Sequence, residues 1–557
     1  MKYSQIFGCV VLFGILVNPL EGSEKNAHAR ESLLRTIGSM QSSANRSGVS
    51  TDFGGKCGLR LSLELLAHWA EFSASEQATL SKYLSPSDRQ KDRIIGKFHF
   101  FYDTTGVSVP ALLGPGNTPI PNSYEAFIDS AGVIFNHVWD YEISVLGYLA
   151  PPLKPDATYW VDIEELGFGL YGRTVPSPLS FGSNPAPKYD SYIEIDNDFR
   201  SYYSNGMAGL RVTAAHEFHH AIQLGGYGSW GTIDYYFLEI TSTWMEDVVY
   251  SDVNDYYQYL TSIPRIPENS QFAYPDFRFT AGNGSIEYSR AVWGKFIEKR
   301  FSPALMLRTW EHMKQANALP AIDRALREVG SSFGEAFSEW AVWNGNTGPL
   351  SDTVRYYEEG RHYPLIRTRP VISYASPQRT IVDSTQAQGS VYIPVMINGV
   401  RMVAIISNLD QQSVSSRKRF SYILQDTELS GSRHLSNGVY ARLDVNDPMN
   451  WSVFETVPSI VSDVVVYPNP YRPRGGNPLA FRLPPVVGTT AALSIFSSSF
   501  NKIHASDEPV LEIRASEPVV RWDGDDESGN LAPTGIYFFV LTIDGKQYSG
   551  KFAVVRE

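Results

Sequence analysis

Two histidines stand four residues apart, His216 and His220, in the segment TAAHEFHHAI at 213–222. On an α-helix this spacing places both imidazoles on one face, where they can bind a single metal ion. Glu217 follows His216 directly, so its carboxylate would lie beside the ion and could take a proton from water. Two imidazoles and one further carboxylate suit zinc and leave a fourth position open for water and substrate. The alternatives are an ordinary helix with unrelated histidines, and a non-catalytic metal site.

A carboxylate on a second helix would complete the set of ligands. Eighteen residues separate His220 from Glu239, which stands in the segment FLEITSTWMED. We predict Glu239 as the third metal ligand, with Glu246 as the alternative. Glu246 and Asp247 are otherwise either solvated carboxylates or groups that orient the histidines from behind. His219 is expected to pack or to support the ligands, and not to bind the metal itself.

This arrangement resembles the gluzincins, the thermolysin-like and aminopeptidase-like zinc peptidases. In their aminopeptidase branch, H-E-x-x-H is followed eighteen residues later by the first Glu of an E-x-x-A-x-[YW]-x-E pattern. Here Glu239, Ser242, Trp244 and Glu246 occupy those places, with Ser where Ala is usual. The spacing fits neither the metzincins nor the aspzincins. The resemblance implies a zincin-like catalytic domain with one Zn²⁺ per chain and Glu217 as general base.

The same resemblance implies a tyrosine that stabilises the oxyanion opposite the zinc. Tyr288 opens the segment Tyr-Ser-Arg-Ala, which is similar to the Y-x-K-G segment of the aminopeptidase branch. Packing of Tyr288 in the core is the competing interpretation. The G-x-M-E-N loop that captures a free amine in aminopeptidases is not visible upstream. Endopeptidase cleavage is therefore favoured, with an edge strand such as 191–196 pairing with an extended peptide.

The likeness extends over roughly residues 95–345 to a largely uncharacterised family of secreted bacterial metalloproteases. Its members carry H-E-[FY]-x-H-A-I-Q and W-x-E-G-T-A-T-W-M-E-D. This chain keeps Ala-Ile-Gln at 221–223 and Thr-Trp-Met-Glu-Asp at 243–247, but has Ile-Thr-Ser at 240–242 in place of Gly-Thr-Ala. These changes leave the predicted ligand in place.

Secondary-structure patterns divide the chain. Residues 59–84 have helical spacing, and residues 94–175 hold short aromatic and β-branched runs typical of strands. Predicted strands lie at 97–102, 159–163 and 192–196, the last of them half-exposed. Predicted helices lie at 207–223, 234–250, 287–300, 304–315, 320–329 and 332–343. Beyond about residue 365 the pattern predicts strands and no helices.

The fold class that follows is a multidomain protein, with an α+β catalytic domain followed by two all-β immunoglobulin-like sandwiches. The last segment opens with YPNP at 467–470 and ends with GKFAVV at 550–555. It resembles the FlgD-like C-terminal modules of exported bacterial proteins, some of which are sorting signals for type IX secretion. The predicted domains are a signal peptide at 1–22, a leader or pro-region at 23–95, a metallopeptidase at 96–360, and β-modules at 366–460 and 464–557.

The N-terminus predicts export. Lys2 precedes an apolar stretch at 6–17, which is too short to span a bilayer; the alternative is a retained anchor. The only cysteines are Cys9 and Cys57, so removal of the signal would leave one thiol. Cys57 is interpreted as a small buried residue, with a reactive thiol or a blocker of the zinc site in a pro-segment as alternatives.

The composition bounds the partners. A formal net charge of -12 without a basic run argues against nucleic acid. The leading prediction is a secreted or surface-exposed bacterial zinc peptidase that acts on a protein or peptide substrate and is not inserted stably in the membrane. Export machinery is a possible partner of the C-terminal module. The alternative is an exported binding protein with a vestigial or structural metal site.

Overall fold

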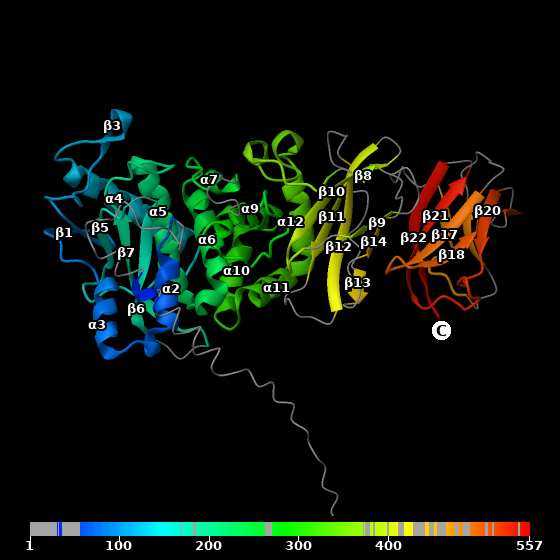
Figure 1. Cartoon of the computed structure of the whole chain (residues 1–557), viewed down its shortest axis with the longest axis horizontal. Coiled ribbons are helices and arrows are strands. Elements are labelled where there is room, and N and C mark those ends of the chain that lie inside the picture. The colour runs from blue at the N-terminus through cyan, green and yellow to red at the C-terminus, as the bar shows by residue number, and fades with distance from the viewer. Residues whose placement is uncertain are drawn as a thin grey trace, which may run out of the picture.

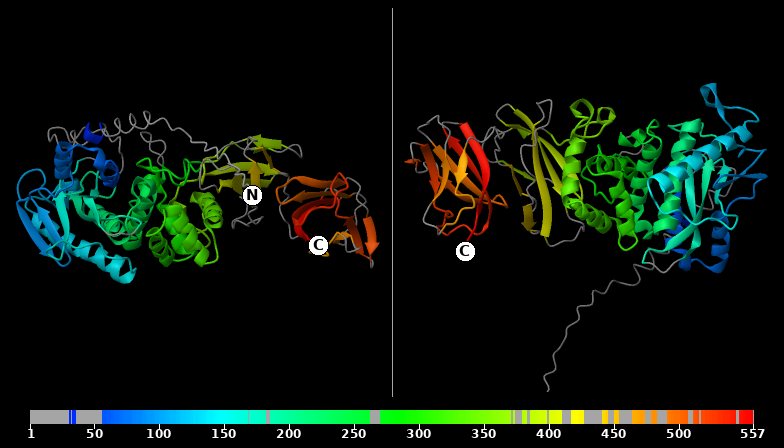
Figure 2. Two further views of the ribbon diagram at one scale, coloured as in Figure 1. Left: turned by 90° about the horizontal axis from the view of Figure 1, so that it is seen from below. Right: turned by 180° about the vertical axis from the view of Figure 1, so that it is seen from behind.

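The computed structural model is elongated, with an α+β region at one end and two β-modules in line beyond it (Figures 1 and 2). The α+β region comprises residues 56–370, and the predicted signal peptide lies outside the described residues. The structure describes residues 31, 33–35, 56–167, 169–181, 185–261, 270–370, 372–373, 379–382, 385–397, 400–409, 417–426, 441–444, 450–453, 464–473, 478–482, 491–506, 511–514, 517–543 and 546–556.

A five-stranded sheet in the order β1-β2-β5-β7-β6 forms the N-terminal half of the α+β region. The strands β2, β5 and β7 are parallel, whereas β1 and β6 run antiparallel to their neighbours. Aromatic and β-branched side chains alternate along these strands and enter the core, as the pattern predicted. The bounds are β1 (Lys91–Ile95), β2 (Phe98–Tyr102), β5 (Tyr159–Glu164), β6 (Gly172–Phe181) and β7 (Lys188–Asp196); β3 (Leu113–Gly114) and β4 (Thr118–Pro119) form a separate small pair.

The strand predicted to be half-exposed and at a sheet edge is neither. β7 lies between β5 and β6, and its acidic residue Glu194 is buried. Arg173 of β6 forms an ion pair with Glu194, and the Tyr192 hydroxyl donates to it at 2.7 Å. The acidic residue that indicated exposure is thus neutralised across the sheet. The strand at this edge is β6.

Two consecutive helices after the sheet carry the predicted site. α5 (Gly206–Ala221) packs on β6 and β7, and α6 (Tyr235–Val249) packs on α5. Both are buried almost all round, as expected of central helices whose side chains are largely small or apolar. A π-helical turn, η5 (Ile222–Tyr227), follows α5 directly, and η6 (Gly231–Asp234) leads into α6.

The remaining helices surround this pair. The helices predicted at 304–315, 320–329 and 332–343 are confirmed within a few residues, whereas the helix predicted at 287–300 is divided at Arg290. The helix α4 (Tyr124–Trp139) was not predicted, because it lies in a region read as strands; it packs on α5 and buries Phe127, Phe135 and Val138. The other bounds are η3 (Pro115–Asn117), η4 (Asp140–Val145), α7 (Tyr257–Leu260), α8 (Ile286–Ser289), α9 (Ala291–Arg300), α10 (Pro303–Met313), α11 (Ala318–Glu328), α12 (Phe333–Gly345), η7 (Gly348–Leu350) and η8 (Gly360–His362).

Two helices precede the sheet, as the spacing predicted. They are α2 (Leu59–Ala67) and α3 (Ala74–Tyr83), joined by η2 (Trp69–Glu71). Ser73 and Glu76 form a capping box at the start of α3. Apolar side chains of α2 and α3 form a small core against β6 and β7, which contains Leu61, Leu65, Phe72, Leu80, Tyr83, Leu84, Val175 and Tyr192.

The C-terminal segment contains two four-stranded antiparallel sheets, β15-β16-β20-β19 and β18-β17-β21-β22, that share one core. Side chains of both sheets, such as Phe481 and Phe539, meet there with ring centroids 4.8 Å apart. An immunoglobulin-like topology stays a prediction. The bounds are β15 (Val465–Tyr467), β16 (Leu479–Arg482), β17 (Ala491–Ser497), β18 (Lys502–Ser506), β19 (Leu511–Arg514), β20 (Glu517–Trp522), β21 (Gly535–Ile543) and β22 (Lys546–Val554).

Between these parts lies a five-stranded sheet, β13-β12-β11-β10-β8, with the separate pair β14-β9. It packs on α12, and the Tyr392 hydroxyl donates to the Ala341 carbonyl at 2.7 Å. The core of the α+β region therefore continues into this sheet. The bounds are β8 (Ile372–Ser373), β9 (Arg379–Val382), β10 (Ser390–Ile397), β11 (Val400–Asn408), β12 (Arg417–Asp426), β13 (Ala441–Asp444) and β14 (Asn450–Val453).

The protein is mixed α and β with several separate sheets, in agreement with the multidomain α+β prediction. Of the helices in the described part of the chain, none has the length and apolar character that crossing a membrane requires.

The packing of α6 against α9 depends on a glycine. A Cβ atom at Gly294 would overlap the indole of Trp244 on α6. We expect Gly294→Ala to destabilise the α+β region by about 1–3 kcal/mol through overpacking, measured as a lower midpoint of its calorimetric transition. Gly360→Ala is the control, because its added Cβ comes no closer than 3.4 Å to Tyr357. Equal midpoints for the two variants would contradict this packing.

Candidate metal centre

Four buried side chains from three distant parts of the chain meet at one point. They are Cys57, His216, His220 and Glu239, and one ligand atom of each lies within 4.8 Å of all the others. α5 supplies both histidines, and α6 supplies the glutamate. Cys57 comes from the segment just before α2. Such a group could hold a metal ion.

The spacing of the three predicted ligands fits a zinc ion. His216 Nε2 lies 3.1 Å from His220 Nε2 and 3.2 Å from Glu239 Oε2, and His220 Nε2 lies 3.5 Å from the same oxygen. Ligands at the usual zinc distances are about 3.3 Å apart along the edges of a tetrahedron. The three atoms thus form one face of a tetrahedron of the right size.

The outer ring nitrogens explain why the Nε2 atoms need a cation. His216 Nδ1 lies 2.7 Å from Glu246 Oε1, and His220 Nδ1 lies 2.7 Å from Gln223 Oε1. Both partners are acceptors, so Nδ1 carries a proton in each ring, and Nε2 directs a lone pair toward the metal position whenever the ring is neutral. Two lone pairs facing each other at 3.1 Å beside a carboxylate repel, unless a proton or a metal ion lies between them.

Glu239 has a second feature of a metal ligand. Its Oε1 atom is buried and has no hydrogen-bond partner among the described residues. A buried carboxylate oxygen without a donor is costly, and a bound dication would compensate for it.

Gln223 is fixed in orientation by the acceptors around its amide nitrogen, which has two hydrogens to donate. The Leu238 carbonyl lies 3.1 Å from this nitrogen, and the hydroxyls of Thr241 and Ser242 lie 3.0 Å from it. Ser242 Oγ also lies 3.1 Å from His220 Nδ1. The Gln of the HEFHHAIQ segment and the Ser that replaces the usual Ala therefore both orient His220. Neither residue was predicted from the sequence to have a role.

Glu246 and Asp247 are placed differently, although they are adjacent in sequence. Glu246 touches His216 Nδ1 and orients that ring from behind, so it is not in the ligand group. Asp247 pairs with Lys295 of α9, and the described residues show no hydrogen bond from it to a histidine. Burial raises the pKa of Asp247 to about 6, while Lys295 lowers it in part.

Glu217 lies beside the ligands, held by β6. Its Oε2 atom lies 2.8 Å from the Thr174 hydroxyl and 3.7 Å from Cys57 Sγ. The strand passes close to α5 at Gly172, where an added Cβ would come within 3.0 Å of the Glu217 side chain. The described residues give the buried Glu217 no ion pair. Thr174 and Gly172 were not anticipated from the sequence.

Tyr288 lies next to His216, with ring centroids 6.2 Å apart and nearly parallel planes. Its hydroxyl is 3.4 Å from that of Tyr235, which stands one helical turn before Glu239. Burial, and then the charge of Glu239, raise the pKa of both tyrosines well above the ordinary value, so both hydroxyls stay protonated donors. The spacing of Tyr235 and Glu239 on α6 could have revealed this second tyrosine.

His219 faces away from the metal position. Its Nδ1 atom lies 2.7 Å from Glu142 Oε2 of η4, and Tyr148 packs edge-on against its ring. Burial lowers the pKa of His219 and raises that of Glu142. The pair is therefore neutral, which agrees with a packing role.

The charges of the ligand group are strongly coupled. Burial lowers the pKa of His216, but Glu239 and Glu246 raise it to about 9. Burial raises the pKa of Glu239, but His220 and His216 lower it to about 2. Burial, then Glu217 and Glu239, raise the pKa of the Cys57 thiol well above its ordinary value. These pKa shifts describe the four side chains without a metal ion. A bound dication would favour the unprotonated form of each ligating imidazole nitrogen and the thiolate form of Cys57.

The chain matches no protein-family model and no curated protein. Among solved structures it is similar to PorZ, an essential bacterial surface component of the type IX secretion system of Porphyromonas gingivalis, at 15% identity over 32% of this chain and 30% of that chain, with a TM-score of 0.14. It is also similar to dimeric latent PorU from Porphyromonas gingivalis, at 14% identity over 33% of this chain and 20% of that one, again with a TM-score of 0.14. The chain thus spans less than a third of either structure, and these scores carry no argument about fold or function.

Glu246 gives a test of the supporting shell. We expect Glu246→Gln to weaken zinc binding by about 10–100-fold, because the charged acceptor behind His216 is lost. Competition with a chromogenic chelator measures the affinity. Glu339→Gln, at a surface carboxylate paired with Arg300, is the control and should bind zinc like the wild type. Wild-type affinity in Glu246→Gln would mean that Glu246 does not support the metal.

Proposed function

We propose that this protein is a zinc-dependent peptidase with His216, His220 and Glu239 as metal ligands and Glu217 as general base. The observation that supports the proposal most directly is the position of Glu217. It is a buried carboxylate beside the ligand group, held by Thr174, with no ion pair in the described part of the chain. A buried negative charge of this kind is costly unless a cation lies nearby.

Zinc bound by these residues would act as a Lewis acid on a peptide carbonyl and would lower the pKa of water. The residues of the chain supply the remaining chemistry. Glu217 takes a proton at its carboxylate and passes it to the leaving amine. Glu246 and Gln223 hold the two imidazoles in place. The Tyr288 hydroxyl is the proposed donor to the oxyanion, with Tyr235 beside it.

The substrate class and the location are parts of the same proposal. The edge strand β6 borders the site through Gly172 and Thr174, and an extended peptide can pair with such an edge. This favours cleavage within a polypeptide. Export through the predicted signal peptide and the type IX-like C-terminal module completes the proposal, with β6 in place of the strand at 191–196.

A second candidate is an exported protein with a structural metal site. Cys57 favours it, because structural zinc sites are closed by four protein ligands and the group of four has that composition. Glu217 argues against it, because a closed structural site has no use for an additional buried carboxylate.

Replacement of the general base separates the two candidates. We expect Glu217→Gln to keep its zinc and to lose peptidase activity by about 10²–10⁴-fold. Activity is measured with fluorescent unfolded casein, in the wild type and in a Cys57→Ala background, because the thiol lies among the ligands. Glu328→Gln, at a surface carboxylate paired with Arg308, is the control. If zinc is bound and neither background cleaves casein or shorter peptides, even after limited proteolysis of the link at 85–90, the structural site is correct.

Tyr288 gives a separate test of the oxyanion donor. We expect Tyr288→Phe to lower kcat by about 10²–10³-fold and to leave KM nearly unchanged, because the hydroxyl acts in the transition state. Tyr236→Phe is the matched control, since Tyr236 is buried nearby and its hydroxyl has no partner among the described residues. A wild-type kcat in Tyr288→Phe would assign Tyr288 to packing.

A further inference from the structure

We propose that the Cys57 thiolate is the fourth ligand of the metal, and that the segment at residues 56–84 thereby keeps the site closed until it is displaced. The inference concerns the regulation of the same site, and only its consequence for activity rests on the proposed peptidase function. The ligand claim itself is independent of any reaction.

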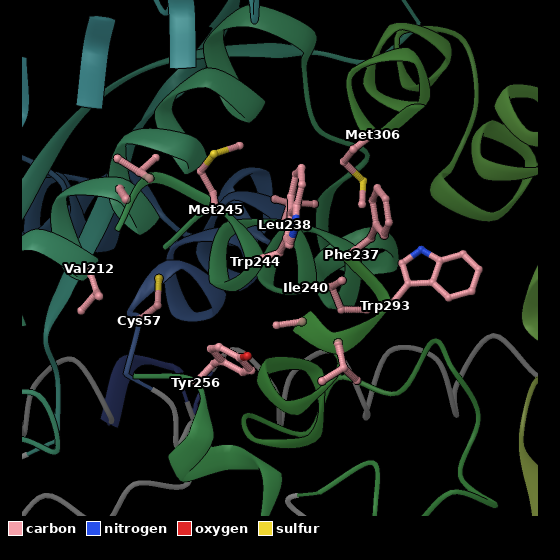
Figure 3. Close-up of a cluster of buried hydrophobic side chains, with 14 of the residues drawn as sticks. Cys57, Val212, Phe237, Leu238, Ile240, Trp244, Met245, Tyr256, Trp293 and Met306 are labelled. Carbon is pink, nitrogen blue, oxygen red and sulfur yellow. The ribbon is translucent and has the colours of Figure 1, made fainter. Parts of the chain in front are cut away.

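The position of the sulfur is the first argument. Cys57 Sγ lies within 4.8 Å of the ligand atoms of both histidines and Glu239, and 3.7 Å from Glu217 Oε2. In a zinc tetrahedron, a sulfur is about 3.6 Å from a nitrogen or oxygen ligand. The upper limit of 4.8 Å exceeds this edge by only about 1 Å, so the sulfur lies close to ligand distance. Figure 3 shows Cys57 at the start of this segment, in the same buried cluster as Val212 of α5 and Met245 of α6.

The backbone around Cys57 holds the sulfur there. Gly58 N donates to the Gly172 carbonyl at 3.2 Å, and Tyr171 N donates to the Lys56 carbonyl at 2.9 Å. Cys57 and Gly172 form an isolated parallel bridge. An added Cβ at Gly58 would come within 2.8 Å of Arg173, so this close approach requires glycine. The segment thus pairs with the edge of β6 through one parallel bridge.

Residues 56–58 occupy the edge of β6 that an extended peptide would use. β6 is the last strand of its sheet, and Thr174 on it holds the proposed general base. A substrate strand and residues 56–58 would need the same backbone groups of Tyr171 and Gly172. The segment therefore blocks the site twice, by filling the metal's fourth position and by pairing with the sheet edge.

Lys56 anchors the segment to the ligand shell. It is buried, and its Nζ atom lies 2.5 Å from Glu246 Oε2 and 2.8 Å from Asp255 Oδ2. The other oxygen of Glu246 faces His216 Nδ1. Burial lowers the pKa of Lys56, but Asp255 and Glu246 raise it well above the ordinary value. The ion pair positions Cys57, the next residue, beside the metal.

Part of the segment has a core of its own. Side chains of α2 and α3 form the small core with Val175 and Tyr192, whereas Cys57 and, on α2, Leu59 and Leu63 belong to the large core around α5 and α6. Residues 85–90 join the segment to β1; Ser85, Ser87 and Asp88 in this link are exposed, although Ser87 N donates to Asp162 and Arg89 pairs with Asp162. Exposed links of this kind are preferred sites of proteolytic cleavage. When the segment leaves, water takes the fourth position and the sulfur takes up a proton; binding reverses both steps.

The experiment uses the full chain with Cys9→Ser, so that Cys57 is the single thiol. X-ray absorption at the zinc edge should show one sulfur at about 2.3 Å from the metal, and none in Cys57→Ala. In the cobalt-substituted forms, acetohydroxamate should change the visible spectrum of Cys57→Ala at concentrations that leave the Cys57 chain unchanged. Cys57→Ser is the second variant, which keeps the size of the side chain.

The outcomes are separate from those for the peptidase. Absence of a zinc–sulfur contact, or equal acetohydroxamate binding with and without the thiol, overturns the inference even if casein is cleaved. A zinc–sulfur contact with acetohydroxamate binding only after its removal supports the inference, even if no variant cleaves a peptide. If the peptidase proposal is also correct, Cys57→Ala and Cys57→Ser should exceed the activity of the Cys57 chain by at least about tenfold, the step that 1.4 kcal/mol of barrier represents.

Discussion

The site depends on one electrostatic constraint, the meeting of two imidazole Nε2 atoms and a carboxylate in the buried interior of the protein. His216 Nε2 and His220 Nε2 are 3.1 Å apart, and both lie within 3.5 Å of Glu239. Each imidazole is held with its proton outward, by Glu246 in one case and Gln223 in the other. Packing of α5 on α6 brings these groups together, so a proton or a metal ion must lie between them, and two imidazoles with a carboxylate are ligands that suit zinc.

The surrounding elements follow from this requirement. The helix α5 lies against the edge strand β6, so Thr174 can hold Glu217 beside the ligands. The π-helical turn η5 begins two residues after His220 and places the Gln223 side chain against the His220 ring. Such turns are frequent at functional sites because they displace side chains from the regular helical spacing.

The occupant of the fourth coordination position decides whether the metal site is closed or open. With Cys57 in place the site has four protein ligands, and without it the site has an open position next to a buried carboxylate. Lys56 couples these two states to the orientation of His216, because Glu246 contacts both residues. Burial of Glu217 has a clear benefit only in the open state, which is why we regard the closed state as latent.

The sequence alone determined the local elements and one face of the site. Four-residue helical spacing brings His216 and His220 together whatever surrounds them, and long periodic segments became helices where expected. Contacts between distant segments were decided only by the tertiary structure. In the structure β6 and not β7 is the edge strand, and Glu194 is buried in an ion pair with Arg173. Glu246 contacts His216, whereas the adjacent Asp247 pairs with Lys295. The tertiary structure also brought Cys57 to a carboxylate 160 positions away, because backbone pairing with β6 and a buried ion pair, which leave no periodic pattern in the sequence, hold it there.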